Sequence, residues 1–470
     1  MNTNARHRCL GAFVAFLAFG LSACGGGGGS ASTPEPLPLP PLAGNLAVPG
    51  AHVVKMRAQG STWIVLAEKP RPHEDNTAPD RHLLLAPPGA TQPLGYRPPA
   101  DWSLIDAALH PSGETTVVLA TAKRLRLQRL GARGQLLSDA EFRDPQAATD
   151  PMFYEYGPYA HDSSALLPFP TRDAVRIAPL GESLVMALRT GRQATVAYGL
   201  RDDRPAGYAL EWRTLVEPGV GISAEAYRGG SGTFDPFGSM ENQYHLALDT
   251  DAQGRIGIAM VVDRTELLYG HRQMFGESSI PAAFEHGVLV TQLSRDGLRL
   301  GALAVDTLEM SELHGARWSA GHLVLTGRVR TEVRADGGGW NAFVGRVAAD
   351  TQRLADYAVV DVDRGDIFFD AVTMSDGRLL LAGSTGYIQN PSGRSVSEAA
   401  WPLLVVCAPG CPHPTRLEVA AGPRHNQLRA LAQWAGRWWV GGMEDGAGTH
   451  TDDADPSGLR SSGYVRAVPA

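Results

Sequence analysis

The chain has 470 residues, of which 43% are hydrophobic, and it carries 42 basic against 49 acidic side chains. A chain of this length and apolar content can bury a large core. A net charge of −7 lacks the basic excess of a nucleic-acid-binding surface, so we expect no nucleic-acid partner.

The first 23 residues have the composition of a secretion signal. Arg6 and Arg8 stand there without any acid, and an apolar run follows over residues 10–21. This run is too short to span a bilayer comfortably. The sequence LSAC, which ends at Cys24, resembles the lipobox of bacterial lipoproteins.

The resemblance implies that the chain is cut before Cys24 and that this cysteine carries lipid. Gly25 follows it, and in the enterobacterial sorting rule of that family this favours the outer membrane. The alternative is an ordinary secretory cleavage beside a cysteine present by chance. We therefore expect a protein of the cell envelope, attached to the outer membrane through the lipid on Cys24.

Cleavage would leave a mature chain with 40 basic and 49 acidic residues, since the leader holds two arginines and no acid. Within residues 24–43, Cys24 is followed by five glycines and then by a stretch containing Ser, Thr and Pro. Such a segment cannot bury a core and is typical of a tether. The expected organisation is a signal peptide over 1–23, a tether over 24–43 and one folded domain over 44–470.

A short repeat recurs along the body of the chain. SAGHLVLTGR from Ser319, SDGRLLLAGS from Ser375 and WAGRWWVGGM from Trp434 each place a glycine turn before an apolar run, which is typical of a β-hairpin. Weaker copies lie upstream, and successive turn glycines are 53 to 73 residues apart. The seven turn glycines are Gly60, Gly113, Gly181, Gly254, Gly321, Gly377 and Gly436.

Each copy is preceded by a strand-like segment, and the first six are followed by a second hairpin-like pair. Four strands per unit at irregular intervals above forty residues predict an all-β fold, a seven-bladed β-propeller. The last copy has room for only three strands before the chain ends. We expect the segment around Leu46–Val48 to supply the missing fourth strand and so close the ring, which resembles the closure of the propeller superfamily.

Four cysteines occur, of which Cys9 leaves with the leader and Cys24 takes the lipid. In an oxidising periplasm, Cys407 and Cys411 are expected to form a disulfide between the third and fourth strands of the sixth blade. The alternatives are free thiols or a zinc site, which would need more ligands than this pair and His413 supply.

Long segments are expected to gather on one face of the ring, because they fall between second and third strands or between blades. They cover 144–170, 218–240, 264–286, 384–401 and 444–463. Aromatic side chains in such loops can stack on sugars or grip a peptide; the alternative is that they pack down onto the rim. The candidate binding face comprises Tyr154, Tyr156, Tyr159, His161, Tyr227, Phe234, Phe237, Tyr269 and His271.

Calcium is the one metal that the sequence suggests. Asp249 and Asp251 are two apart before a glycine, but no EF-hand loop with its closing glutamate is completed. The alternative is that these acids cap a tight turn. No other cofactor is predicted.

The interpretation that follows is a lipid-anchored propeller that binds or scaffolds an envelope protein or a glycan. The alternatives are a hydrolase or lyase acting on envelope polymers, and an assembly factor for outer-membrane proteins. No G-x-S-x-G motif supports an enzyme, and the histidines are scattered. An enzyme would collect acids, histidines and arginines in one pocket at the mouth of the propeller channel, whereas a protein scaffold would show a broad apolar patch.

Overall fold

A computed structural model describes residues 46–69, 80–88, 92–121, 124–145, 175–189, 195–217, 246–262, 287–307, 311–331, 339–349, 353–363, 365–386, 400–421, 425–446 and 462–468. The chain divides into Met1–Pro38, which lies outside these ranges, and a compact unit from Leu39 to Ala470. Within the described ranges the regular elements are β-strands, and no apolar helix of bilayer-spanning length occurs among them.

The strands form seven four-stranded blades. Blade 1 contains β2 (His52–Gln59), β3 (Thr62–Glu68), β4 (Arg81–Ala86) and β5 (Leu94–Tyr96). Blade 2 contains β6 (Ser103–Leu109), β7 (Thr115–Ala120), β8 (Leu125–Leu130) and β9 (Leu136–Phe142). Blade 3 contains β10 (Val175–Leu180), β11 (Ser183–Arg189), β12 (Thr195–Asp202) and β13 (Tyr208–Glu217). Blade 4 contains β14 (Leu246–Thr250), β15 (Ile256–Val262), β16 (Gly287–Leu293) and β17 (Arg299–Asp306).

Blade 5 contains β18 (Ser311–Ser319), β19 (His322–Arg330), β20 (Trp340–Ala348) and β21 (Leu354–Val360). Blade 6 contains β22 (Ile367–Thr373), β23 (Leu379–Thr385), β24 (Trp401–Cys407) and β25 (Thr415–Leu417). Blade 7 contains β26 (His425–Trp434), β27 (Arg437–Gly446), β28 (Ser462–Ala467) and, as its fourth strand, β1 (Leu46–Pro49).

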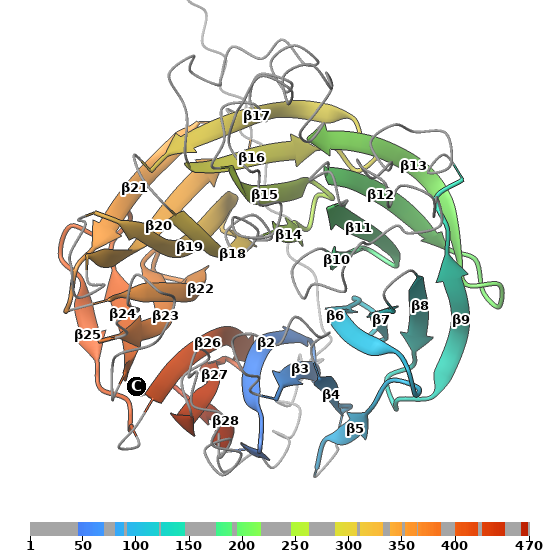
Figure 1. Cartoon of the computed structure of the whole chain (residues 1–470), viewed down its shortest axis with the longest axis horizontal. Coiled ribbons are helices and arrows are strands. Elements are labelled where there is room, and N and C mark those ends of the chain that lie inside the picture. The colour runs from blue at the N-terminus through green and yellow to red at the C-terminus, as the bar shows by residue number, and fades with distance from the viewer. Residues whose placement is uncertain are drawn as a thin grey trace, which may run out of the picture. The chain divides into compact units, whose positions relative to one another are not determined.

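The blades stand side by side around a central axis, with the first strand of each innermost (Figure 1). The N-terminal strand β1 pairs antiparallel with β28, so that Val48 lies opposite Gly463 and Leu46 opposite Val465. The protein is therefore a seven-bladed β-propeller, and the predicted closure of the last blade by the start of the body is confirmed.

The middle strands of the blades are apolar along most of their length. Every residue of β3, β16 and β23 is buried. A strand covered on both faces needs apolar side chains at consecutive positions rather than at alternate ones. The outer strands β9, β17 and β21 instead mix buried and exposed positions, because they form the rim of the ring.

The core lies between the blades. Among the described residues, apolar side chains form seven buried clusters, each of which joins two neighbouring blades. The cluster between blades 7 and 1 contains Val48 of β1 together with Val53, Trp63, Trp434 and Trp439. The closing strand is therefore part of the core that holds the first blade to the last.

The two faces of the ring differ in their connections. Each turn between a first and a second strand contains one of the seven predicted glycines, with φ between +57° and +84°, a conformation that a Cβ disfavours. We call this side the turn face. The links between blades and the connections from second to third strands leave the other side, which we call the connection face. All five long segments predicted to share a face join strand ends on the connection face.

Five inner strands carry a β-bulge. The residues that the bulges add are Val54 in β2, Ile105 in β6, His314 in β18, Phe369 in β22 and Arg429 in β26. A bulge inserts a residue without a cross-strand partner and re-aims the side chains beside it. In blades 1, 2, 5, 6 and 7 the inner strand therefore departs from simple alternation.

A glycine on the second strand makes room for the bulge in blades 5, 6 and 7. A Cβ atom on Gly327, Gly383 or Gly442 would lie 1.9 Å from a backbone carbonyl oxygen of the first strand. Each of these glycines stands six residues after the turn glycine of its repeat. The second glycine of the repeat is therefore explained by the close approach of the bulged strand.

Replacing Gly383 by alanine is expected to lower the free energy of unfolding by about 1 to 3 kcal/mol, the usual cost of overpacking. The new Cβ meets the carbonyl oxygen of Ile367, which is backbone and cannot move alone. Urea unfolding followed by tryptophan fluorescence measures the change. Gly95→Ala is the control, because a Cβ there has no atom within 4 Å. Equal midpoints for the two variants would contradict the explanation.

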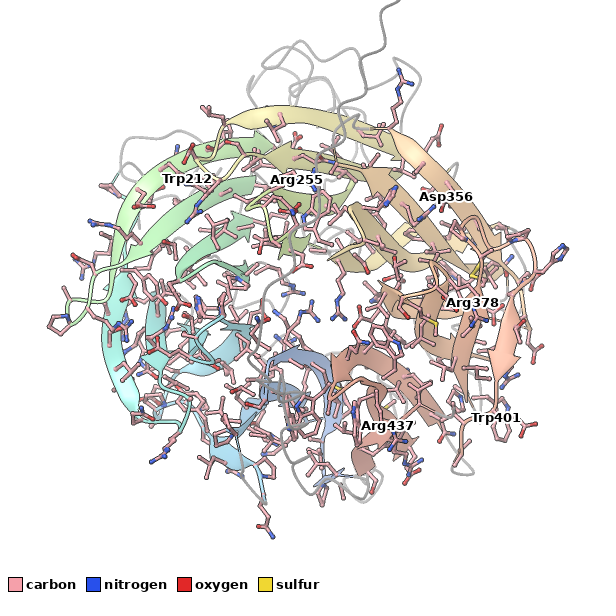
Figure 2. The ribbon with its side chains drawn as sticks, turned by 180° about the vertical axis from the view of Figure 1, so that it is seen from behind. Trp212, Arg255, Asp356, Arg378, Trp401 and Arg437 are labelled. Atoms are coloured by element: carbon pink, nitrogen blue, oxygen red, sulfur yellow. A yellow bond between two sulfur atoms is a disulfide. The ribbon has the colours of Figure 1, made fainter. Side chains whose placement is uncertain are left out.

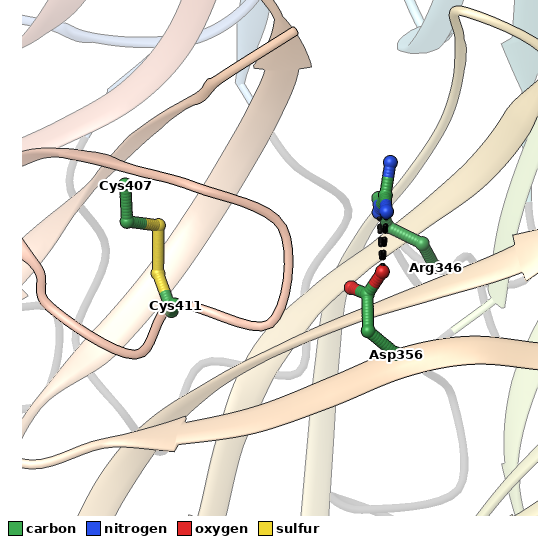
Figure 3. The surroundings of a disulfide bond; sticks show 4 residues. All are labelled: Arg346, Asp356, Cys407 and Cys411. Atoms are coloured by element: carbon green, nitrogen blue, oxygen red, sulfur yellow. Dashed lines mark hydrogen bonds and ion pairs between the residues drawn. A yellow bond between two sulfur atoms is a disulfide. The ribbon is translucent and has the colours of Figure 1, made fainter.

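Cys407 and Cys411 form the predicted disulfide, with Cα atoms 5.0 Å apart (Figure 3). The bond closes the turn between β24 and β25, as expected, and both sulfur atoms are used by it. This turn lies against blade 5, since a Cβ on Gly410 would be 3.8 Å from the Cβ of Asp356. The Asp356 carboxylate in turn accepts a 2.8 Å hydrogen bond from Arg346 Nε. The free-thiol and zinc interpretations of this pair are therefore set aside.

Candidate functional site

A cavity of about 200 Å³ lies at the ring axis, lined by side chains from all seven inner strands. Seen from behind, side chains reach from these strands toward the centre (Figure 2). The five bulge residues are all in the lining. The ionisable lining residues are Lys55, Arg57, Glu68, Arg81, Asp106, Arg176, His314, Asp370 and Arg429.

The cavity lining reaches from the connection face to the middle of the inner strands and, at Arg57, into the turn-face half of β2. Leu246 is the first residue of β14 and Arg176 the second of β10, and inner strands begin at the connection face. Glu68 ends β3 and Arg81 begins β4, which again places them at the connection face. The cavity therefore reaches the face of the ring that carries the strand ends joined by the long segments.

Asp106 joins blade 2 to blades 1 and 3. Its Oδ1 accepts hydrogen bonds from Lys55 Nζ at 2.7 Å and from the amide of Ala107 at 2.9 Å, and its Oδ2 accepts from the amide of Ile177 at 3.0 Å. Burial by itself raises the pKa of Asp106, but Lys55, Arg176 and the hydrogen bonds outweigh it and lower the pKa. The carboxylate stays ionised and links neighbouring blades through its hydrogen bonds.

Asp370 makes the same arrangement in blade 6. Its Oδ1 accepts from the amide of Ala371 at 2.9 Å, and its Oδ2 accepts from the amide of Leu431 in blade 7 at 2.8 Å. Arg317 Nη1 lies 3.2 Å from the same oxygen and also donates to the carbonyl of Leu431 at 2.7 Å. Burial lowers the pKa of Arg317 although Asp370 opposes this.

His314 reaches the cavity from β18. Its Nε2 donates to Glu312 Oε2 at 3.1 Å, and Glu312 also accepts from Arg328 Nη2 at 2.6 Å. Burial lowers the pKa of His314 despite the neighbouring carboxylate. Burial raises the pKa of Glu312, but Arg328 and His314 outweigh it and leave that pKa well below its usual value. The imidazole is therefore neutral near pH 7, and its carboxylate neighbour is held by an arginine.

The two aspartates suggested for calcium have other partners. Asp249 Oδ2 accepts from the amide of Trp318 in blade 5 at 2.8 Å. Asp251 Oδ1 accepts from the amides of Gln253 and Arg255 at 2.9 and 2.8 Å, which caps the turn as the alternative interpretation expected. Asp249 is thus a third aspartate that joins neighbouring blades. Across the described part of the chain, no three His, Cys, Asp or Glu side chains are grouped to hold a metal ion.

The predicted aromatic binding face lies outside the described residues, and so does the lipidation site Cys24. The aromatic set is Tyr154, Tyr156, Tyr159, His161, Tyr227, Phe234, Phe237, Tyr269 and His271. What the structure adds is the charged cavity at the ring axis, none of whose residues was among the predicted site residues.

Two acidic residues of the cavity, Asp106 and Asp370, stand at the same position of their repeats. Asp106 and Asp370 each stand seven residues before a turn glycine and are each followed by alanine. Both also follow a bulge residue. No comparable signal marks Arg57, which stands three residues before the turn glycine Gly60 and does not follow directly on the bulge of β2.

A second polar cluster lies near the turn face between blades 2 and 3. His110 Nδ1 donates to the carbonyl of Gly181 at 3.0 Å, so its Nε2 accepts from the hydroxyl of Thr116 at 2.8 Å. The Thr116 oxygen also accepts from the Tyr208 hydroxyl, which accepts from Arg129 Nη1 at 3.3 Å. The chain of hydrogen bonds fixes His110 in its neutral form.

This cluster predicts a pH dependence of stability. Burial, with the charge of Arg129, lowers the pKa of His110 from 6.5 to about 3. The unfolded chain takes up the proton at the ordinary pKa, so this stabilisation is complete above pH 6.5 and is lost as the pH falls toward 3. Between pH 7.5 and pH 5 the loss is about 2 kcal/mol.

The measurement is urea unfolding of the protein and of His110→Gln at both pH values. The variant is expected to be less stable at pH 7.5. It is also expected to lose less stability on acidification, because its unfolded chain has no imidazole at position 110 to take up a proton. His322→Gln, at the β18–β19 turn, is the control and should keep the full pH dependence. A wild-type slope retained by His110→Gln would refute the assignment.

No protein-family model matches the sequence, and comparison with curated proteins finds no relative. Solved propellers are similar in shape at low identity. The structure described as YCF48 bound to D1 peptide has a TM-score of 0.42 at 10% identity, covering 91% of this chain and 96% of that one. The β-propeller domain of the Trilobed protease from Pyrococcus furiosus has a TM-score of 0.41 at 9% identity, with 89% and 96% covered. The WD40 β-propeller domain of Doa1 has a TM-score of 0.40 at 8% identity, with 90% and 95% covered.

Proposed function

We propose that the protein is a binding module of the cell envelope whose partner docks on the connection face, over the axial cavity. The observation that carries this proposal is that the cavity reaches the face of the ring that carries the strand ends joined by the long segments. Long loops and a concave site on one face of a rigid scaffold are where such folds bind their ligands. The proposed partner is an envelope protein or a glycan. If the partner is an outer-membrane protein, the module would act in the assembly of such proteins.

The cavity contains the residue types expected of an enzyme, since acids, a histidine and arginines gather in it. Their bonding favours ligand binding instead. Asp106 and Asp370 use both carboxylate oxygens on backbone amides and cations. No described lining residue carries a hydroxyl or thiol nucleophile. Catalysis through a serine, threonine or cysteine nucleophile would therefore need groups other than those described.

The apolar patch expected of a protein scaffold is also not what the described surface offers. Large exposed apolar side chains are distributed over the outer strands of several blades, for example Leu94, Leu136, Leu210 and Leu354. Recognition through the charged axial cavity, from the connection face, is the form of binding that we propose.

The test is thermal unfolding with a panel of cell-wall glycan fragments and envelope-protein peptides. A ligand that binds only the folded state stabilises it, by about 2.7 kcal/mol at a hundred times its Kd. Each ligand that raises the Tm is then measured on two labelled variants. One carries a bulky maleimide at Lys69→Cys, directly after β3 on the connection face, and the other carries it at Arg437→Cys, at the β26–β27 turn on the turn face. Binding lost only with the Lys69 label supports the proposal, and loss only with the Arg437 label overturns it.

Attachment through Cys24 belongs to the same proposal. Growth with an alkyne-bearing fatty acid is expected to label the protein, and Cys24→Ala is expected to abolish the label. Separation of inner and outer membranes then locates the labelled protein. A labelled Cys24→Ala variant would show that the lipobox resemblance is misleading.

A further inference from the structure

The axial cavity has an excess of positive charge. Its described lining holds five Lys and Arg side chains against three Asp and Glu. Lys55 pairs with Asp106, and Arg81 Nε donates to Glu68 Oε2 at 2.7 Å. The remaining acid, Asp370, is used by Arg317, which is outside the lining. None of the three described carboxylates of the lining is therefore paired with Arg57.

Arg57 is the clearest case of this excess. Its guanidinium has five N–H donors, and its one hydrogen bond in the described structure goes from Nη1 to the carbonyl of Met56 at 2.8 Å. No carboxylate of the described residues forms an ion pair with it. A guanidinium that lines a cavity with most of its donors free of protein acceptors can direct them at a ligand.

The positive charge of Arg57 also acts on neighbouring cations. Burial lowers the pKa of Lys55, and the charges of Arg57 and Arg176 lower it further despite the bond to Asp106. The charge of Arg57, from blade 1, also contributes to lowering the pKa of Arg317, from blade 5. Cations that enter from different blades therefore repel one another near the axis.

We propose that the axial cavity binds an oxyanion, a carboxylate or phosphate group, with Arg57 as the residue that recognises it. This inference rests on the proposed function and names the chemistry of the ligand. A cavity of about 200 Å³ is smaller than the usual site for a drug-sized molecule. It suits an anionic end group of a larger partner or a small free anion. The planar guanidinium suits both, because its donors can form paired hydrogen bonds to two oxygens.

The experiment titrates the purified protein with inorganic phosphate, with N-acetyl-alanine and with N-acetyl-alanine amide, at constant ionic strength, by calorimetry. Phosphate and the free acid represent the two sources of an oxyanion, and the amide is the neutral match of the acid. Binding of at least one anion, with no heat from the amide, is the expected result. Equal binding of acid and amide, or no binding of either anion, overturns the oxyanion site.

Arg57→Gln separates recognition from structure. It is expected to weaken anion binding about 10- to 100-fold, the loss of one charged hydrogen bond. Without ligand it is expected to melt at a higher temperature than the wild type, because cation repulsion is relieved. Arg57→Lys keeps the charge and should retain part of the affinity. Arg437→Gln, an exposed arginine at the β26–β27 turn, should change neither property.

The outcomes distinguish this inference from the proposed function. A variant Arg57→Gln that melts lower and binds the anions unchanged would make Arg57 structural and overturn the inference. If a panel ligand blocked by the Lys69 label binds Arg57→Gln as tightly as wild type, docking on the connection face stands without an oxyanion. If anions bind through Arg57 while no ligand is sensitive to the Lys69 label, the site stands and the docking proposal fails.

Discussion

Replacing Val48 by aspartate is expected to lower the free energy of unfolding by about 3 to 5 kcal/mol. Val48 is 4% exposed and lies in the apolar cluster between blades 7 and 1. A carboxylate there has no basic partner in that cluster, so the new charge is buried unpaired. Since β1 is the strand that closes the ring, release of β1 would also expose the edge of β28, which favours aggregation.

The control is the same substitution one residue earlier. Ala47 is exposed and its side chain points away from the cluster, so Ala47→Asp should change stability by about 0.5 kcal/mol or less. Gly463→Val tests the closure from the partner strand, because a Cβ there would lie 2.5 Å from the carbonyl oxygen of Ala51. Urea unfolding and size-exclusion chromatography measure both effects. Equal losses at Val48 and Ala47 would show that β1 does not close the ring in solution.

Asp106→Asn is expected to lower the free energy of unfolding by about 3 kcal/mol. The substitution removes the charge that compensates Lys55, whose ammonium lies 2.7 Å away beside the repelling Arg57 and Arg176. It also weakens the acceptor of the amide of Ile177, which joins blade 2 to blade 3. The loss should therefore be larger than that of an ordinary surface ion pair.

A double-mutant cycle identifies the cause. Lys55→Met in the Asp106→Asn background should recover part of the lost stability, because the uncompensated ammonium is then absent. Asp376→Asn, which breaks an exposed ion pair with Arg378, should give no measurable change. The unfolding midpoint in urea is the measured quantity. Strict additivity of the Lys55 and Asp106 substitutions would show that the pair is not coupled.

Local sequence patterns were enough to predict the architecture. Turn glycines before apolar runs identify the hairpins because positive φ and the strand period are local properties. The incomplete last copy predicted β1, and the structure places it at Leu46–Pro49 against β28. The disulfide was also predictable, because Cys407 and Cys411 are close in the chain and fall in one turn.

The candidate site was predictable only in part. The shared face of the long segments follows from strand order alone. The aromatic set chosen on those segments remains a prediction, since it lies outside the described residues. For Asp251 the structure supports turn capping, whereas Asp249 joins blade 4 to blade 5. The charged cavity was missed, although Asp106 and Asp370 repeat at one position of their blades.

The sequence by itself determined the seven blades, their turns and the closure of the ring, because these depend on residues that are neighbours in the chain or on a strand count. Only the tertiary structure decided which charged side chains meet at the axis. Lys55, Arg57, Asp106 and Asp370 come from three blades, and the bulges before Lys55, Asp106 and Asp370 change the direction of their strands. A period of two cannot predict a side chain's direction across a bulge, and no local pattern states which distant charges will share one buried space.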